Sequence, residues 1–368
     1  MKNEEKDERN LYIILALAFI LILIVVMIRS FRIGGANKQV AVGGVFIGEC
    51  TDKGWNESHG RGLETACEKM NCSFFKRENV PEEEAALSEA VDALINEGCT
   101  VIFLTSQGYG VFADPIAKSH SDTAFFCLDS TGEAKNRISY FARLYQVRYL
   151  SGIIAGKASN TGVLGYVAAD KNPQTNRGIN AYALGMRYAN PDARLLVYFT
   201  GSYENEAEEK KAVRLLASEG ADVITYHEDK PFAIEAAEEL GLFSTGYDAV
   251  YTDYSERFLA AALYDWEVIY ERAIGDYLSG RANFSDGYWL DLSDGAVKLA
   301  IYSPLVSEET RQDVEQETSR IQTNRDVFSG VIYDSNGMLR CGENERISDE
   351  ELYTGMKWFV EGVEIYEE

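Results

Sequence analysis

Beyond its first forty residues the chain alternates between short apolar runs and amphipathic helical patterns, and this alternation restricts the possible fold most strongly. In the first half, strands are expected at 42–47, 101–105 and 124–128, and helices at 56–70, 82–97 and 109–119. A repeated strand-helix-strand order builds a parallel sheet with helices on both of its faces. The sequence therefore predicts an α/β protein.

The same alternation returns in a second set of elements. Strands are expected at 162–168, 194–200, 222–226 and 242–246, with helices at 176–188, 206–218 and 231–240. A helix at 146–157 would carry the chain from the first set to the second. Two doubly wound parallel-sheet lobes joined by a hinge fit the architecture of type I periplasmic binding proteins.

The final third follows a different pattern. We expect a long amphipathic helix over 256–279, a pair of strands over 288–302 turning at 293–295, a helix over 306–322, a strand over 326–332 and a closing helix over 349–363. The predicted domains are lobe 1 at 41–150, lobe 2 at 151–285, and a returning segment at 286–368 that is shared between the lobes and completes lobe 1.

An uncharged apolar run occupies 11–28. As a helix it would extend about 27 Å, close to the thickness of a bilayer's hydrocarbon core. We interpret it as an N-terminal transmembrane helix, an uncleaved signal, between a short cytoplasmic tail at 1–10 and a linker at 29–40. Cleavage near 34–36 is the alternative. The main body is then expected outside the cell, attached to the membrane by this helix.

Composition argues against several classes of function. A net charge of −24 disfavours nucleic-acid binding, because that binding depends largely on Lys and Arg that neutralise phosphates. The three histidines are widely spread, and no Ser-His-Asp arrangement, GxGxxG after a strand or GxxxxGK[ST] motif is found. The six cysteines form no CxxC pair. We therefore expect a protein that is not an enzyme and that uses no metal or cofactor.

The first candidate site follows the first predicted strand. Asp52, Trp55 and Asn56 lie where this strand ends and a helix begins. Ligands of open α/β sheets bind at the carboxyl ends of strands, and an acid, an indole and an amide can hold a flat polar molecule there. Asp and Asn also favour helix starts for local reasons, so a helix cap with a core Trp fits equally well.

Many short stretches resemble, in order, the basic membrane protein (BMP) family, the substrate-binding components of ABC transporters that include purine and nucleoside receptors. The resemblance runs from about Val42 to Val363. The stretches that carry it are 52–56, 78–82, 101–106, 108–109, 146–152, 165–168, 177–182, 190–192, 200–203, 220–227, 326–334 and 358–363.

The resemblance implies a two-lobed receptor that closes on a purine base or nucleoside, with an ABC permease and ATPase as partners. Asp52 and Asn56 would bind polar edges, and Trp55 would stack on the base. Further contacts are implied for Ser106, Tyr109, Tyr203 and Asp248, the last accepting ribose hydroxyls. Gln107 departs from the family pattern, in which an aromatic residue is usual.

Two questions stay open from the sequence. His227 follows a strand end, so its ring either hydrogen-bonds the ligand from the second lobe or caps the following turn. The retained apolar helix also differs from typical family members, which are lipoproteins. A membrane-anchored sensory or regulatory ectodomain, with a different ligand or none, is therefore the alternative to a receptor that feeds an importer.

Overall fold

The computed structural model describes residues 39–248, 253–282, 284, 287–323 and 326–366. The chain divides into two compact units, Met1–Val40 and Ala41–Glu368. The predicted tail at 1–10, the apolar run at 11–28 and nearly all of the linker at 29–40 lie outside the described residues. Among the residues that are described, no helix is both long and apolar enough to cross a bilayer.

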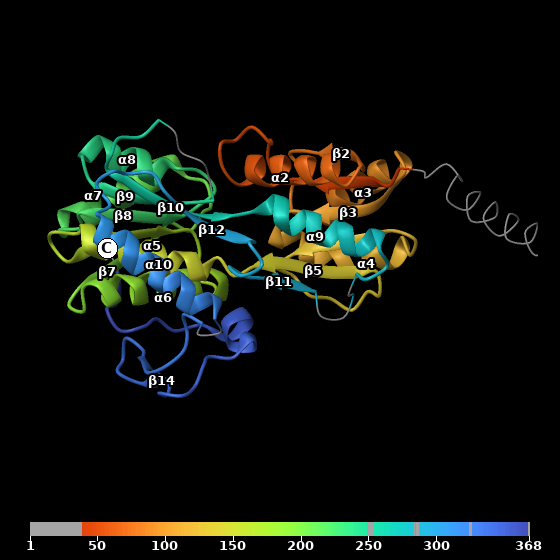
Figure 1. Cartoon of the computed structure of the whole chain (residues 1–368). Helices are drawn as coiled ribbons and strands as arrows, with labels where there is room; N and C mark the ends of the chain where they lie inside the picture. The colour runs from red at the N-terminus through yellow and green to blue at the C-terminus, as the bar shows by residue number, and fades with distance from the viewer. Residues whose placement is uncertain (1–38, 249–252, 283, 285–286, 324–325, 367–368) are drawn as a thin grey trace, which may run out of the picture. The chain divides into compact units, whose positions relative to one another are not determined.

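The first lobe is built on a six-stranded sheet in the order β11-β5-β4-β3-β1-β2, with parallel pairing throughout. Helices cover this sheet, and Figure 1 shows them around its strands. The elements are β1 (Ala41–Val45), α2 (Trp55–Lys69), β2 (Ser73–Arg77), α3 (Glu84–Asn96), β3 (Cys99–Leu104), the 3-10 turn η1 (Gln107–Tyr109), α4 (Gly110–Ser119), β4 (Ala124–Leu128), β5 (Arg137–Ala142) and β11 (Tyr288–Leu290).

The second lobe has a seven-stranded sheet in the order β12-β10-β9-β8-β6-β7-β15, in which only the β10–β12 pair is antiparallel. Its elements are α5 (Tyr145–Ala158), β6 (Val163–Ala168), α6 (Pro173–Ala189), β7 (Arg194–Phe199), α7 (Glu206–Ser218), β8 (Val223–His227), α8 (Phe232–Leu240), β9 (Phe243–Tyr247), β10 (Phe258–Tyr264), β12 (Val297–Ile301) and β15 (Val363–Ile365). The predicted α/β class with parallel sheets is confirmed.

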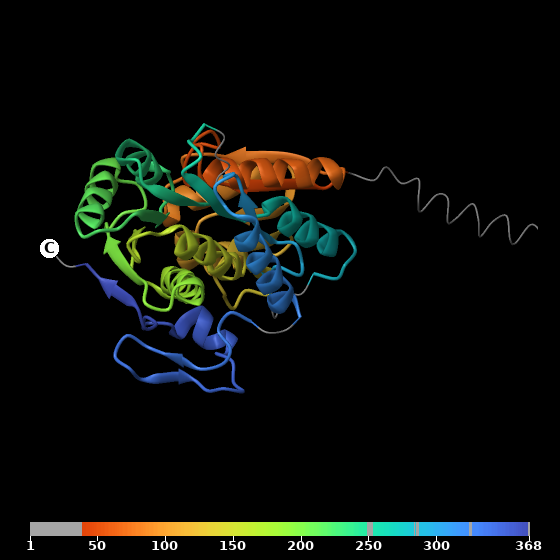
Figure 2. The ribbon, with the colours of Figure 1, turned by 60° about the vertical axis from the view of Figure 1, so that its left-hand side comes forward.

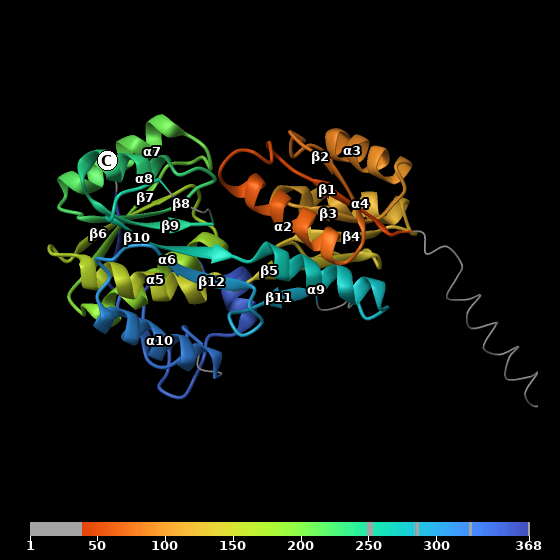
Figure 3. The same cartoon turned by 45° about the horizontal axis from the view of Figure 1, so that its top comes forward.

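The chain passes between the two sheets three times within the described residues. The crossings follow β5, β10 and β11, and they lead to α5, α9 (Trp266–Leu278) and β12. Helix α9 returns to the first lobe and packs against α2. In Figure 3 these connections run through the region where the lobes meet.

The C-terminal segment lies against the second lobe. It contains α10 (Glu308–Gln322), the hairpin of β13 (Ile332–Tyr333) and β14 (Leu339–Cys341), and the π-helical turn η2 (Glu351–Gly355). Turn η2 packs on α6, as the blue segment in Figure 2 shows. Of the tail's strands, β11 joins the first sheet, whereas β12 and β15 join the second.

Four predicted elements of the tail are wrong. Of the expected strand at 326–332 only Ile332 belongs to a strand, β13, because the residues before it form turns and a single bridge. The expected helix at 256–279 is strand β10 followed by helix α9, because Phe258–Tyr264 is an apolar run buried on both faces of a sheet. The strands at 288–302 do not form a hairpin, since β11 and β12 belong to different sheets. The closing helix at 349–363 is the single turn η2 followed by an irregular segment and β15.

Close packing of α5 and α6 fixes the base of the second lobe. A Cβ on Gly185 would lie 1.9 Å from the Tyr149 carbonyl oxygen, and one on Gly152 would lie 2.2 Å from that of Tyr182. These contacts require glycine, because any side chain would push the helices apart. At its start α6 is capped by Asn172, whose Oδ1 accepts a hydrogen bond from Thr175 N at 3.0 Å, with Pro173 in the first helical position.

Candidate functional site

A pocket of about 280 Å³ opens where the carboxyl ends of both sheets face each other. Its walls come from residues that end or directly follow β3, β4, β6, β7, β8 and β9, and from the loops after β1 and β2. This edge is where ligands of open α/β sheets bind. We call it the aromatic pocket; its lining residues are Ile47, Trp55, Glu82, Ser106, Gln107, Gly108, Leu128, Asp170, Asn172, Gln174, Tyr203, His227, Asp229 and Tyr247.

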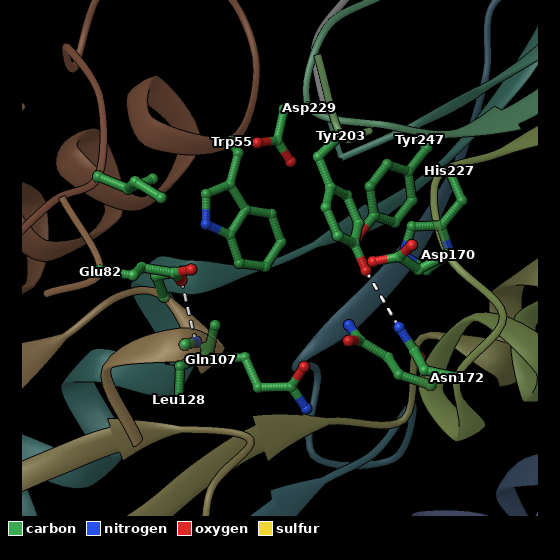
Figure 4. Close-up of a pocket in the computed structure, with 14 residues that line it drawn as sticks. Trp55, Glu82, Gln107, Leu128, Asp170, Asn172, Tyr203, His227, Asp229 and Tyr247 are labelled. Atoms are coloured by element: carbon green, nitrogen blue, oxygen red, sulfur yellow. Dashed lines mark hydrogen bonds between the residues drawn. The ribbon is translucent and has the colours of Figure 1, made fainter. Parts of the chain in front are cut away.

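Aromatic rings from both lobes line this pocket. Figure 4 shows Trp55 of the first lobe facing Tyr203 and Tyr247 of the second. The indole is held in place because its Nε1 donates to the Thr105 carbonyl oxygen at 3.0 Å. The Tyr203 hydroxyl accepts a hydrogen bond from Asn172 Nδ2 at 3.1 Å, and burial raises the pKa of this phenol to about 12. A flat ligand between these rings would have apolar contact on two sides.

Three carboxylates stand among the rings. Glu82 accepts hydrogen bonds from Ser106 Oγ and from Gly108 N, the latter at 3.0 Å. At Asp170 and Asp229, no hydrogen bond or ion pair from the described residues reaches the carboxylate. Burial, reinforced by nearby acidic side chains, raises the pKa of Asp229 to about 7. None of the described residues that line this pocket is Lys or Arg, so its field favours hydrogen-bond donors and disfavours phosphate.

His227 ends β8 and closes the pocket from the second lobe. Its ring centroid lies 4.4 Å from that of Tyr247, and its Nδ1 has no hydrogen-bond partner. Burial, with the positive charges of Arg148 and Arg177, lowers the pKa of this imidazole well below its usual value. The ring is therefore neutral at physiological pH and can present either a donor or an acceptor.

Four of the eight site residues predicted from the sequence line the aromatic pocket: Trp55, Ser106, Tyr203 and His227. The other four are not in its wall. Asp52 accepts hydrogen bonds from Gly54 N, Asn56 N, Asn56 Nδ2 and Glu57 N. These are the bonds that the helix-cap alternative predicts for Asp52. Asn56 in turn accepts from Gly48 N at 3.1 Å. Both side chains shape the start of α2 behind Trp55.

Tyr109 and Asp248 lie deeper. Tyr109 is buried in the core of the first lobe and donates its hydroxyl to the Val80 carbonyl oxygen at 2.5 Å. Asp248 accepts from Trp266 Nε1 at 3.2 Å, from Tyr264 N at 3.3 Å and from Ser58 Oγ at 3.3 Å. Burial raises the pKa of Asp248 to about 8. Ligand contacts by Asp52, Asn56, Tyr109 and Asp248 stay predictions.

Sequence reasoning missed most of the polar wall. Asp170 and Asp229 each stand two residues after a strand end, and Asn172 stands four residues after the end of β6. The sequence carries a signal for these three residues. Strands are expected at 162–168 and 222–226, and polar residues just beyond parallel strands meet at the carboxyl edge of the sheet. Glu82 offered no such signal: it follows the edge strand β2 after an irregular loop.

Comparison with known proteins assigns the family. A family model described as "ABC transporter substrate-binding protein PnrA-like" matches residues 39–327. The chain belongs to this Bmp family. The Bmp proteins are substrate-binding proteins rather than enzymes, in agreement with the sequence analysis. A small-molecule ligand and ABC-transporter partners follow from membership.

Two relatives illustrate the range of the Bmp family. A purine-binding protein of Brucella abortus is 29% identical over 353 residues, covering 93% of this chain and 99% of the relative. A putative ABC transporter glucose-binding protein of Haloferax volcanii is 30% identical over 336 residues, covering 90% of this chain and 82% of the relative.

Solved structures show the same fold. A transcriptional activator from Bacillus halodurans superposes with a TM-score of 0.69 at 20% identity, covering 77% of this chain and 98% of the other. An ABC transporter solute-binding protein from Aeropyrum pernix superposes with a TM-score of 0.67 at 20% identity, covering 86% of this chain and 98% of the other.

Proposed function

We propose that this protein is an extracytoplasmic solute receptor of an ABC importer, which binds a purine base or nucleoside between its lobes and closes on it. The observation that carries the proposal is the aromatic pocket itself, in which Trp55, Tyr203 and Tyr247 stand around three carboxylates. A purine has two π-faces and an edge of donors and acceptors. Stacking would hold its faces while the carboxylates accept its N–H groups.

The charge of the wall narrows the ligand class. Because Glu82, Asp170 and Asp229 line the pocket without a Lys or Arg among its described lining residues, a phosphorylated nucleotide would meet repulsion. An uncharged base or nucleoside would not. One relative is named as a purine-binding protein, which supports the same class.

Closure of the lobes would give the permease a liganded state to recognise. The lobes touch at the mouth of the pocket, where a Cβ on Gly54 would lie only 1.9 Å from the Asp229 carbonyl oxygen. In this proposal the apolar run at 11–28 holds the receptor to the outer face of the cell membrane, within reach of the permease.

Direct binding tests the proposal. The full chain in detergent micelles is titrated with adenine, guanine, hypoxanthine and their nucleosides, with adenosine monophosphate and glucose as comparison ligands. A ligand at 100 times its dissociation constant stabilises the folded state by about 2.7 kcal/mol, which a thermal-shift measurement detects. We expect a shift with at least one base or nucleoside and none with the monophosphate. A response to glucose alone would replace purine by sugar as the ligand class.

A second candidate is a sensory or regulatory ectodomain that uses the same pocket. It is favoured by the likeness to the Bacillus halodurans structure, which is described as a transcriptional activator. Uptake of radiolabelled purine by cells with and without this protein separates the two functions. Loss of uptake in its absence supports the importer, and unchanged uptake with intact purine binding supports the sensor.

A further inference from the structure

A second cavity of about 320 Å³ adjoins the aromatic pocket. The two share Gln107, Asn172 and Gln174, which form the wall between them. Figure 4 shows Gln107 on the first-lobe side of the pocket and Asn172 on the second-lobe side, with the Asn172 amide directed at Tyr203. We call it the polar cavity; its remaining lining residues are Asp129, Ser130, Thr131, Pro173, Tyr353 and Thr354.

Three parts of the chain build the polar cavity. Asp129, Ser130 and Thr131 follow β4 of the first lobe, and Asn172 to Gln174 begin α6 of the second. Tyr353 and Thr354 come from turn η2, which packs on α6 and lies beyond residues 39–327 matched by the family model. This wall therefore comes from the C-terminal segment, outside the stretch that the family model matches.

The side chains of the polar cavity suit a ligand that carries several hydroxyl groups. Amides such as Gln107 and Gln174 both donate and accept hydrogen bonds, and so do hydroxyls such as that of Thr131. A sugar hydroxyl has the same double capacity. The aromatic pocket shares these two amides, but it adds three carboxylates, which only accept, and the rings of Trp55, Tyr203 and Tyr247.

Asp129 provides a carboxylate oxygen that accepts no hydrogen bond from the protein. Its side chain is 4% exposed; Oδ2 accepts from Gln107 Nε2 at 3.2 Å, whereas Oδ1 has no hydrogen-bond partner. Its ion pair with Arg177 is long, at 3.8 Å, and Arg177 NH2 also lacks a hydrogen-bond partner. Unpaired buried polar atoms are unfavourable, so a donor delivered by a ligand would be strongly bound.

The other carboxylate considered for sugar binding is already occupied. Asp248 is 3% exposed and accepts three hydrogen bonds from protein groups, those of Ser58, Tyr264 and Trp266. It lines neither the aromatic pocket nor the polar cavity. A sugar could reach Asp248 only after these bonds were broken.

We propose that the polar cavity is a subsite for the hydroxyl-bearing part of a ligand whose flat part occupies the aromatic pocket. This inference rests on the proposed function, since it assumes a base between Trp55 and Tyr203. It assigns the sugar of a nucleoside to Asp129, Gln107, Gln174 and turn η2 rather than to Asp248.

Calorimetric titration of the full chain with adenine and adenosine tests the subsite. One additional neutral hydrogen bond is worth about 1 kcal/mol, so the wild-type protein should bind adenosine roughly fivefold or more tightly than adenine. Thr131→Trp, which places an indole in the polar cavity, should remove this advantage and leave adenine affinity within about twofold. Tyr203→Ala should weaken both ligands alike through lost stacking, by roughly fivefold.

Two further variants keep the test decisive. Val111→Trp adds an indole at a position that is 76% exposed on the same lobe, and it should bind both ligands as the wild type does. If Thr131→Trp does not fold, Gln174→Met, which keeps length but removes the amide, takes its place and should reduce adenosine affinity more than adenine affinity.

The outcomes separate the two proposals. If the wild type binds adenine and adenosine equally, or if filling the polar cavity leaves adenosine affinity unchanged, the subsite is overturned and the purine assignment stands. If the folded wild type binds neither, both proposals fall.

Discussion

The contact region between the lobes has a filled side and a hollow side, and Trp55 lies at their boundary. On the filled side Trp266, His59, Tyr264 and Tyr270 pack against one another, with the Trp266 ring centroid 3.7 Å from that of His59 and 4.5 Å from that of Tyr264. On the hollow side the rings of Tyr203 and Tyr247 stand around an open pocket.

The difference lies in how the polar groups are satisfied. Asp248 on the filled side accepts three hydrogen bonds from the protein itself. Asp170 and Asp229 on the hollow side receive no hydrogen bond or ion pair from the described residues. Both sides thus combine aromatic rings with carboxylates, but only the hollow side offers acceptors that the protein itself does not use.

Removal of Trp266 should have the largest effect. Trp266 is 2% exposed and packs against six rings, so Trp266→Ala leaves a cavity and should lower the free energy of unfolding by about 3–5 kcal/mol. Urea denaturation measures this loss. The matched change on the hollow side, Tyr203→Ala, should cost less than about 1 kcal/mol, since that ring already faces a pocket. Equal losses would remove the distinction between the two sides.

Loss of the Asp229 charge should have the next largest effect, this time on affinity. Hydrogen bonds to charged groups are worth about 1.5–3 kcal/mol, so Asp229→Asn should weaken a donor-bearing purine roughly tenfold to a hundredfold. Because the pKa of Asp229 is raised to about 7, its carboxylate gains charge as the pH rises through that value.

Calorimetry at pH 6 and pH 8 separates this charge effect from a change in shape. Wild-type affinity should increase between these pH values, whereas the affinity of the Asn variant should stay flat. A wild-type affinity that is constant over this range would show that the Asp229 carboxylate does not contact the ligand.

A methyl group at Gly54 tests whether the hollow side is closed by contact between the lobes. In Gly54→Ala the new Cβ would lie 1.9 Å from the Asp229 carbonyl oxygen, so the closed form should be disfavoured by about 1–3 kcal/mol. Ligand affinity should fall by roughly tenfold, and small-angle scattering should show a larger radius of gyration. Gly275→Ala is the control, because its Cβ meets only the flexible end of Met70. Unchanged affinity in the Gly54 variant would mean that this contact does not limit closure.

The smallest effect is expected from Asp248→Asn on the filled side. The folded state raises the pKa of this carboxyl to about 8, against about 3.9 when unfolded. Between these values the folded state binds more protons, so this residue makes the protein less stable as the pH rises from 4 to 8. Relative to wild type, the Asn variant should gain about 1 kcal/mol between pH 7 and pH 8 in urea denaturation. The exposed control Asp192→Asn should show no such gain.

The sequence predicted the fold well where local pattern and burial agree. The predicted strand at 124–128 and helix at 206–218 match β4 and α7 to the residue. The pattern failed at β10, because Leu259 to Ala262 are strong helix formers whose strand conformation is imposed by the neighbouring strands on both edges.

The candidate site was predicted in part for a related reason. Position after a strand end indicated Trp55 and His227, the family resemblance implied Ser106 and Tyr203, and all four line the pocket. What the sequence could not reveal is which carboxylates are already satisfied. Asp52 and Asp248 carry the same chemistry as Asp229, and only the packing of Asn56 and Trp266 around them decides that their oxygens are occupied.

The three crossings between the sheets restrict how the lobes can move. Connections that lie together after β5, β10 and β11 permit bending about one line and resist sliding or twisting. Displacement then grows with distance from that line, so the outer rims of the lobes travel farthest. In the proposed importer, a permease that contacts the outer rims of both lobes could detect a bound solute from the distance between its two contact sites, without touching the solute.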